Sequence, residues 1–477
     1  MDIIQDIIDR NRWEVAFAIR SNSMSEKEFL EAEIGHWKHS EARKLMLTGE
    51  RYYNGDHDIL QRQRTARSGK DVQEVTGVPN CRIVDNQYAR LLEQKVNYML
   101  ARPISVGSED PAYAEVLTEI FGEDFDRTLK SVCVDSINYG VAYVYVTLGP
   151  DGKLLFCRIP AVEVLPFWRD ANHTEMDMAV RIYKRVVYEG KNRTIKEFAE
   201  VYKPEGVEFY RLESGRLIPD AQIAAGYVSF NDANGEVKDY TWGRIPLVAF
   251  KYNHKEEPLI KCTKSLQDSL NLAHSDFANS NAEDVRNTVL VLKNYDGTNL
   301  EEFRHNLNTY GVVKVRADQG GGVDTLKIDV SPAAYEALRD AMKRALVENA
   351  RGYDAREDSG MGNVNELNIK SMYSDIELDI AGMETEYQAA LQQLLYFVNV
   401  HLASAGKGDF SGEKAEFTFT HSIMVNEGGL IDNIVKSADY VSKDTLMAKH
   451  PWITDVEAEK DRLKKQMEED INGLQPV

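Results

Sequence analysis

The sequence lacks any run of about 18 consecutive apolar residues, the length that a helix needs to cross a bilayer. Its first ten residues, Met1–Arg10, are acidic and amphipathic, whereas a secretory signal begins with a basic segment followed by an apolar one. With 43% hydrophobic and 28% charged residues, the composition is typical of a soluble globular protein. We therefore expect a chain that stays in a cytoplasm and makes no contact with a membrane.

Cysteine is scarce, and the four cysteines are far apart: Cys81, Cys133, Cys157 and Cys262. No CxxC pair occurs, which argues against a disulfide framework and against a zinc ribbon. The ten histidines are scattered, and HExxH, GxSxG and GxGxxG motifs are missing. We expect neither a metal site nor a cofactor.

A phosphate-binding loop is also missing. Walker A requires GxxxxGK[ST], and the nearest glycine-rich segments, Gly406–Gly408 and Gly320–Gly322, lack the Lys-Ser/Thr pair. The acidic pairs Glu256-Glu257 and Glu301-Glu302 are typical of solvated faces. We predict that the protein is not an enzyme.

Positive charge is in deficit, because 57 Lys and Arg face 77 Asp and Glu, for a net charge of −20. A protein that grips nucleic acid with its overall field needs clustered Lys and Arg, so that class is excluded. An acidic surface that lets DNA pass remains possible, although most acidic proteins are acidic only for solubility. One local basic cluster stands out, Lys343-Arg344 with Arg351 and Arg356, and it is either a solvated helix face or a DNA contact.

The length of 477 residues favours two to four subdomains. Helical spacing extends from Ser25 to Tyr53 and ends at an Asn-Gly turn, Gln61–Asp71 looks disordered, and Val78–Asn86 leads into a helix that ends at Arg102-Pro103. Alternating strands of an antiparallel sheet are predicted at 141–147, 154–159, 180–187, 194–202, 206–212 and 245–252.

Two slender helices follow, one from Thr263 and one from a Ser331-Pro332 N-cap to Tyr353. The first has a narrow apolar stripe and is otherwise polar, which predicts that its polar positions meet water or another chain. Between the helices the pattern predicts a small α/β module with strands 288–292, 311–316 and 323–330 and a helix at 300–307. The arrangement resembles a stalk with a head, not a pocket.

A glycine-flanked polar loop then leads into a long amphipathic helix that ends near Leu402. Gly352, Gly360 and Gly362 can adopt positive φ, which predicts a moving part. A strand at 416–423 and three short helices should complete the chain, the last with a capping box at Thr454–Glu457.

Taken in order, several segments resemble the portal proteins of tailed double-stranded DNA bacteriophages, in the siphophage-type family of phages of Gram-positive hosts. The resemblance covers roughly residues 40 to 470 and is most specific at Met372–Asp379 with Gly382–Glu386. The other segments that carry it are Tyr52–Ile59, Asn80–Asn86, Gln94–Pro103, Tyr139–Tyr143, Ile159-Pro160 and Arg244–Pro246.

The resemblance implies an α+β, multi-part portal fold in a ring of about twelve chains around a DNA channel. Its parts would be a wing of mixed helices and antiparallel sheet (1–260 and 369–425), a two-helix stem (261–286 and 331–354), a small α/β clip (287–330), a tunnel loop (355–368) and a helical crown (426–477). Relatives often carry Gly-Asn-x-Ser-Gly-x-Ala-Leu-Lys where this chain has Gly362–Lys370. Glu366 replaces a glycine there, so we expect a stiffer hinge.

The implied site residues fall into three groups. The tunnel loop would present Arg356, Asp358, Ser359, Gly360, Met361, Gly362, Asn363, Val364 and Asn365 to DNA. The stem would line the channel with Arg339, Lys343, Arg344 and Arg351, and the clip would meet the packaging motor and adaptors through Asn299, Glu301, Glu302, Arg304 and His305.

The implied function is DNA packaging, genome retention, head-tail joining and DNA ejection at one vertex of the virion capsid, after assembly in the host cytoplasm. The implied partners are further copies of the chain, passing double-stranded DNA of any sequence, the terminase motor, head-completion or adaptor proteins, and the major capsid and scaffolding proteins. Two alternatives remain from the residues alone: an enzymatic subunit of the packaging machine, such as a nuclease or motor, and a monomeric tail or adaptor protein.

Overall fold

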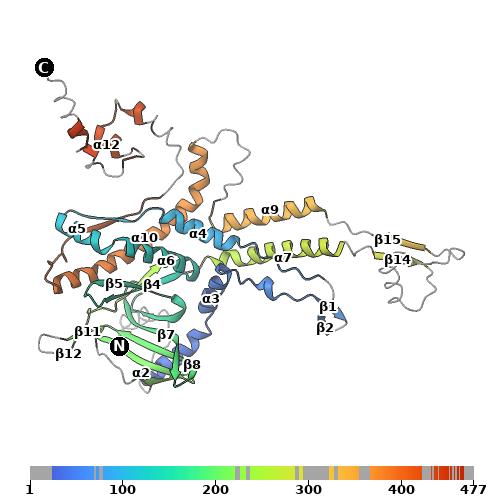
Figure 1. The fold of residues 1–477 in the computed structure, drawn as a ribbon, viewed down its shortest axis with the longest axis horizontal. Coiled ribbons are helices and arrows are strands. Elements are labelled where there is room, and N and C mark those ends of the chain that lie inside the picture. The colour runs from blue at the N-terminus through green and yellow to red at the C-terminus, as the bar shows by residue number, and fades with distance from the viewer. Residues whose placement is uncertain are drawn as a thin grey trace, which may run out of the picture.

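A computed structural model describes residues 24–68, 71–74, 79–220, 226–231, 237–284, 289–293, 322–326, 331–353, 366–421, 431, 434–438, 440–448, 450, 452–453, 456, 459–460 and 462–466. The fold is α+β, as the sequence predicted. A body of helices and sheets carries two long helices, α7 and α9, which project from it side by side, with a two-stranded hairpin at their far end (Figure 1). The expected helix at 300–307, the strand at 311–316 and the capping box at 454–457 lie outside the described residues.

The single helix expected between Ser25 and Tyr53 is wrong, because the chain forms two helices, α2 (Glu26–Lys38) and α3 (Glu41–Tyr53). Each begins at a serine whose side chain accepts a hydrogen bond from a backbone N–H of the first turn. The second of these caps, Ser40, starts a new helix where the apolar spacing alone suggested continuity. The expected turn after Tyr53 is confirmed, with Gly55 at φ 83° and a short 3-10 helix, η1 (Asp58–Gln61), beyond it.

The disorder expected from Gln61 to Asp71 is also wrong, because β1 (Thr65–Ser68) and β2 (Asp71–Glu74) pair as an antiparallel hairpin. The following helix, α4 (Gln87–Met99), starts at the Asn86 cap, whose side chain accepts from the Ala89 N–H at 3.0 Å.

The larger sheet has five antiparallel strands in the order β10-β9-β8-β7-β6. The strands are β6 (Val164–Trp168), β7 (Met176–Glu189), β8 (Asn192–Lys203), β9 (Gly206–Glu213) and β10 (Arg216–Pro219). Helix α2 covers one face of this sheet, where its buried Phe29, Leu30 and Ile34 join apolar residues of the strands. The strands expected at 180–187, 194–202 and 206–212 are confirmed.

A three-stranded sheet, in the order β13-β4-β5, lies in the main core. It contains β4 (Val141–Leu148), β5 (Leu154–Ile159) and β13 (Leu247–Lys251), which confirms the three remaining strand predictions. Shorter antiparallel pairs join β11 (Val228–Asn231) to β12 (Val237–Tyr240) and β3 (Ser105–Ser108) to β16 (Ala415–Thr418), so the last strand is shorter than expected.

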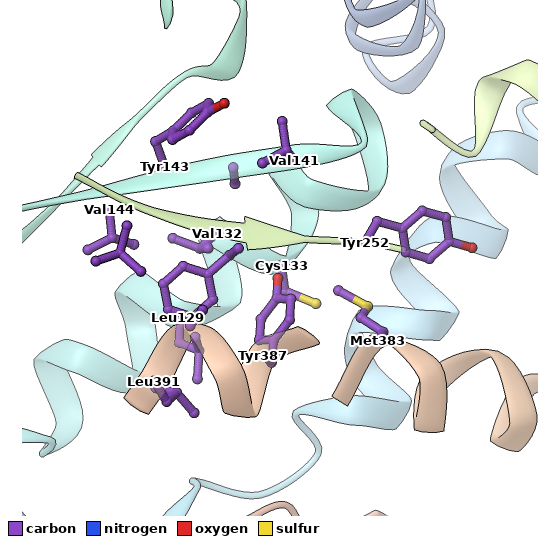
Figure 2. Close-up of a cluster of buried hydrophobic side chains, with 14 of the residues drawn as sticks. Leu129, Val132, Cys133, Val141, Tyr143, Val144, Tyr252, Met383, Tyr387 and Leu391 are labelled. Atoms are coloured by element: carbon purple, nitrogen blue, oxygen red, sulfur yellow. The ribbon is translucent and has the colours of Figure 1, made fainter. Parts of the chain in front are cut away.

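The core forms where α6 (Glu123–Tyr139) and the 39-residue helix α10 (Glu366–Ser404) pack with β4 and β13. Figure 2 shows Tyr387 of α10 pointing toward Cys133 of α6 and the strands. The Tyr387 hydroxyl lies 2.7 Å from Ser136 Oγ, and its ring meets Phe250 edge-on. Helix α5 (Pro111–Ile120) packs against the same core through buried apolar side chains. The long helix is confirmed, but it starts at Glu366, so residues 366–368 belong to it and not to a loop.

The projecting pair consists of α7 (Ile260–Asp284) and α9 (Pro332–Asn349). The hairpin between them in sequence pairs β14 (Val289–Lys293) with β15 (Gly322–Leu326), close to two of the three predicted strands. Near the C-terminus the structure describes helix α12 (Lys443–Ala448), and residues 434–437 and 462–466 are helical as well. Within the described residues, no helix is both long and apolar enough to cross a membrane.

Candidate functional site

Helix α7 buries one polar side chain every four residues: Thr263, Gln267, Asn271, Ser275 and Asn279. Four of these five accept hydrogen bonds from backbone N–H groups of residues 81–88, which lie along the helix. Asn279 Oδ1 accepts from Cys81 N at 2.6 Å, Ser275 Oγ from Ile83 N at 2.9 Å, Asn271 Oδ1 from Asp85 N at 3.0 Å, and Gln267 Oε1 from Tyr88 N at 3.0 Å. We call these four side chains the polar ladder.

For one row of this helix, the polar ladder corrects the expectation that its polar positions meet water or another chain, whereas polar residues such as Ser265 and Asp276 are exposed. An extended segment outside a sheet leaves its N–H groups without partners, and burying such a group costs about 1–3 kcal/mol. Side chains spaced four apart fall on one face of a helix; three of them supply acceptors for alternate residues of the segment, and Gln267 supplies one for the first turn of α4. The ladder therefore fixes residues 81–86 against α7.

Asp85 extends this attachment to α9. Its Oδ2 lies 2.8 Å from Lys343 Nζ and 3.2 Å from His274 Nε2. Although burial alone would raise it, the hydrogen bonds from Lys343 and Gln87 hold the pKa of Asp85 below its usual value. Farther out, Tyr335 stacks on Phe277, with ring centroids 3.9 Å apart. The two helices are thus held together by both ionic and aromatic contacts.

A buried charge cluster lies at the base of the helix pair. Asp379 of α10 accepts from Lys95 Nζ at 2.6 Å and from the Tyr252 hydroxyl at 2.7 Å, and Arg351 Nη1 approaches it to 3.3 Å. The Lys95 side chain is wholly inaccessible to solvent. Burial lowers the pKa of Lys95, and the Asp379 carboxylate opposes that shift. This cluster joins α4, α10, the end of β13 and the segment after α9.

The chain that follows α9 is held in place at Tyr353, next to this cluster. The Gln94 side chain makes two hydrogen bonds with the backbone of Tyr353, at 2.7 and 2.9 Å. The Tyr353 ring stacks on Tyr373 of α10 with centroids 4.3 Å apart. Residue 353 precedes the segment 354–365 and Tyr373 lies two turns into the helix that follows it, so this contact joins the chain before the segment to the helix after it. A Cβ on Gly352 would lie 2.5 Å from Leu91 Cδ2, which leaves room only for glycine unless Leu91 shifts.

The predicted stem residues are found on and just after α9. Arg339 pairs with Asp340, Lys343 with Asp85, and Arg351 with Asp379, while Arg344 is exposed. Lys343 and Arg351 therefore brace the helix pair through carboxylates of the body. The predicted tunnel-loop residues between 356 and 365 and the clip residues 299, 301, 302, 304 and 305 lie outside the described residues.

Sequence reasoning missed Asp85, Asp379 and Lys95. Lys95 and Asp379 stand inside two of the segments that carried the resemblance, but their pairing spans 284 positions and no local pattern reveals it. The polar ladder did leave a signal, the four-residue spacing of amides and a hydroxyl on α7.

No group of three or more His, Cys, Asp or Glu side chains is placed to hold a metal ion within the part of the chain that the structure describes. Among the cysteines, burial raises the pKa of the Cys133 thiol to about 12, so it stays protonated at neutral pH.

The family model described as "Phage portal protein, SPP1 Gp6-like" matches residues 36–473. The chain belongs to this portal protein family. The portal protein of Bacillus phage SPP1 is 28% identical over 428 residues, which cover 88% of this chain and 83% of that relative. The portal protein of Clostridium phage phiCD119 is 23% identical over 427 residues, with 87% and 91% covered. The family assignment from the sequence is confirmed, and portal proteins are structural proteins, not enzymes.

Among solved structures, this portal protein is similar to chains described as the neck of an empty GTA particle with C6 symmetry and of a native GTA particle with C12 symmetry. Both have a TM-score of 0.39 and 12% identity; they cover 75% and 76% of this chain and 88% and 89% of theirs.

Proposed function

We propose that this portal protein forms a closed ring of about twelve chains at one vertex of the capsid, with a central channel through which a separate motor drives double-stranded DNA. In this ring α7 and α9 are the stem, residues 287–330 form the clip, residues 354–365 form the tunnel loop, and residues 426–477 form the crown. The same channel later retains the genome and releases it.

The observation that carries the proposal is the exposure of α9. At 1.5 Å per residue its 18 residues extend about 27 Å, yet Leu346 is its one buried side chain. Ala334, Leu338 and Ala341 recur at a spacing of three or four and are exposed on a second apolar face, beside the face that meets α7. A neighbouring copy of α7 or α9 would bury this face, and repeating that contact around an axis closes a ring.

The net charge of −20 suits a channel that must not hold DNA, because an acidic wall repels phosphate. The joint formed by Tyr353, Tyr373 and the Asp379 cluster suits a loop that moves on a fixed root. We infer that the tunnel loop makes the transient contacts with DNA. Lys343 and Arg351 instead hold the helix pair to the body through Asp85 and Asp379.

The partners follow from the same arrangement. The clip, at the end of the projecting helices, would meet the terminase motor and later the head-completion or adaptor proteins. The body would meet the major capsid and scaffolding proteins. The protein would act in the virion at the portal vertex, after assembly in the host cytoplasm.

The test is a double substitution on the second face of α9, Leu338→Glu with Ala341→Glu. Negative charges on this face should prevent ring closure, because like charges would be buried in every interface. Glu336→Ala, which changes an exposed residue on the other side of the helix, is the matched control. Native mass spectrometry should show rings for the control and folded single chains for the double variant. Rings in both variants would show that this face of α9 is not an interface.

A further inference from the structure

The β7–β8 hairpin extends beyond the sheet that it belongs to. Strand β6 pairs with β7 only as far as Arg181, and β9 pairs with β8 only as far as Glu197. Beyond these points β7 and β8 pair with each other alone, down to Glu189 and Asn192. Residues 183–197 thus form a two-stranded ribbon, which we call the ribbon.

One face of the ribbon carries apolar side chains that are exposed and are not covered by the part of the chain that the structure describes. Val186 pairs with Ile195, and Tyr188 follows on the same side two residues along. These side chains are 43%, 63% and 67% exposed, respectively. The alternation of β7 and β8 places them on the face that α2 covers farther back, at Ile182 and Ala199. That cover stops at the end of α2, where Lys38 Nζ lies 2.7 Å from Glu197 Oε2.

The ribbon is also basic. It carries five cations, Lys184, Arg185, Lys191, Arg193 and Lys196, against Glu189 and Glu197, a difference of +3 in a chain whose net charge is −20. Lys184 and Arg193 flank the apolar residues on the uncovered face, because Lys184 pairs opposite Glu197 and Arg193 opposite Tyr188. A segment that fits this face must be both apolar and acidic.

The first residues of the chain have this chemistry. Ile3, Ile4, Ile7 and Ile8 fall on one side at helical spacing, and Asp2, Asp6 and Asp9 supply three negative charges. Helix α2 starts at the other end of its sheet face, where Glu26 lies 2.6 Å from Lys203 Nζ. Its 13 residues span about 20 Å, and the 16 residues that connect residue 9 to α2 would span about 24 Å even as a helix. A return path along α2 is therefore long enough to reach the ribbon.

We propose that residues 2–9 dock on the uncovered face of the ribbon in the same chain. The isoleucines cover Val186, Tyr188 and Ile195, and the aspartates lie within the range of Lys184 and Arg193. This contact belongs to the single chain and does not depend on ring formation.

Disulfide trapping tests the contact in the full-length protein. Ile4→Cys with Ile195→Cys, in a background with Cys81, Cys157 and Cys262 changed to serine, is oxidised with diamide at micromolar concentration. Ile4→Cys with Arg185→Cys is the matched control, because Arg185 lies on the opposite face of the same ribbon. A docked, tethered segment should cross-link to position 195 within the chain about tenfold faster than to position 185.

Charge reversal tests the ionic part of the proposed contact. Asp2→Lys, Asp6→Lys and Asp9→Lys together should slow the trapping at low salt, and Lys184→Glu with Arg193→Glu should restore it. Equal trapping at positions 195 and 185 would overturn the proposal, since the segment would then be undocked. Disulfide-linked dimers in place of the intrachain product would also overturn it, because the occupant would then be a second copy.

Discussion

Replacing Asp379 with asparagine should destabilise the portal protein strongly, because it leaves Lys95 buried without a counterion. The side chain of Lys95 is 0% exposed and that of Asp379 is 14% exposed, so water cannot replace the lost carboxylate. Breaking a buried ion pair by removing one partner costs about 3–5 kcal/mol. Asparagine keeps the shape of the side chain and an acceptor for Tyr252, so the change acts mainly on charge.

The pH dependence gives the prediction a second, independent signature. The pKa of Lys95 is lowered in the folded protein, so above that pKa the unfolded chain binds more protons and stability rises with pH. Without the Asp379 carboxylate this pKa should fall further. The penalty of Asp379→Asn should therefore be largest near pH 6 and shrink toward about pH 9.

Urea unfolding at fixed protein concentration, followed by circular dichroism, measures both effects. Arg351→Ala is the matched control, because this partner of Asp379 is 65% exposed and its loss should cost no more than about 1 kcal/mol. Adding Lys95→Met to Asp379→Asn should recover part of the loss. A penalty of less than about 1 kcal/mol for Asp379→Asn, unchanged between the two pH values, would refute the assignment of a buried, charged Lys95.

Three further predictions concern single positions. Ser275→Ala should lower the free energy of unfolding by about 1–3 kcal/mol, because the Ile83 N–H loses its acceptor, whereas Ser265→Ala on the exposed side should be neutral in the same urea titration. Gly140→Ala should abolish soluble expression, since φ of Gly140 is 86° and a Cβ would lie 2.0 Å from the carbonyl oxygen of residue 256. Gly152 also has a positive φ, 76°, but faces open space, so Gly152→Ala should lower the free energy of unfolding by only about 1–2 kcal/mol. Burial raises the pKa of Asp135 to about 6, so the stability contributed by the protonated carboxyl is lost as pH rises through that value. At pH 8, Asp135→Asn should be about 3 kcal/mol more stable than the wild type and should melt at a higher temperature. Near pH 4 this advantage should vanish.

The sequence predicted six of the eight strands of the two main sheets and the long helices, because alternation and helical spacing are local signals; it missed the short edge strands β6 and β10. The break at Ser40 was missed because the apolar spacing continues across it, although a serine followed by a charged turn is itself a capping signal. The hairpin of β1 and β2 was missed because its residues are mostly polar and show no apolar alternation.

The site was less predictable, because its contacts join residues far apart in the chain. The polar ladder pairs α7 with residues 179 to 198 positions earlier, so a polar helix face that is buried within the chain looks the same in sequence as one that meets solvent. The cluster of Lys95 and Asp379 has the same origin, since its members are contributed by separate helices.

The mass of the purified protein tests the central claim most directly. A closed ring of twelve 54.1 kDa chains has a mass of about 650 kDa, and native mass spectrometry resolves it from rings of neighbouring size. We expect a closed ring, and thirteen copies would correct only the number of subunits. A stable single chain at every salt concentration would contradict the assignment of a ring-forming portal.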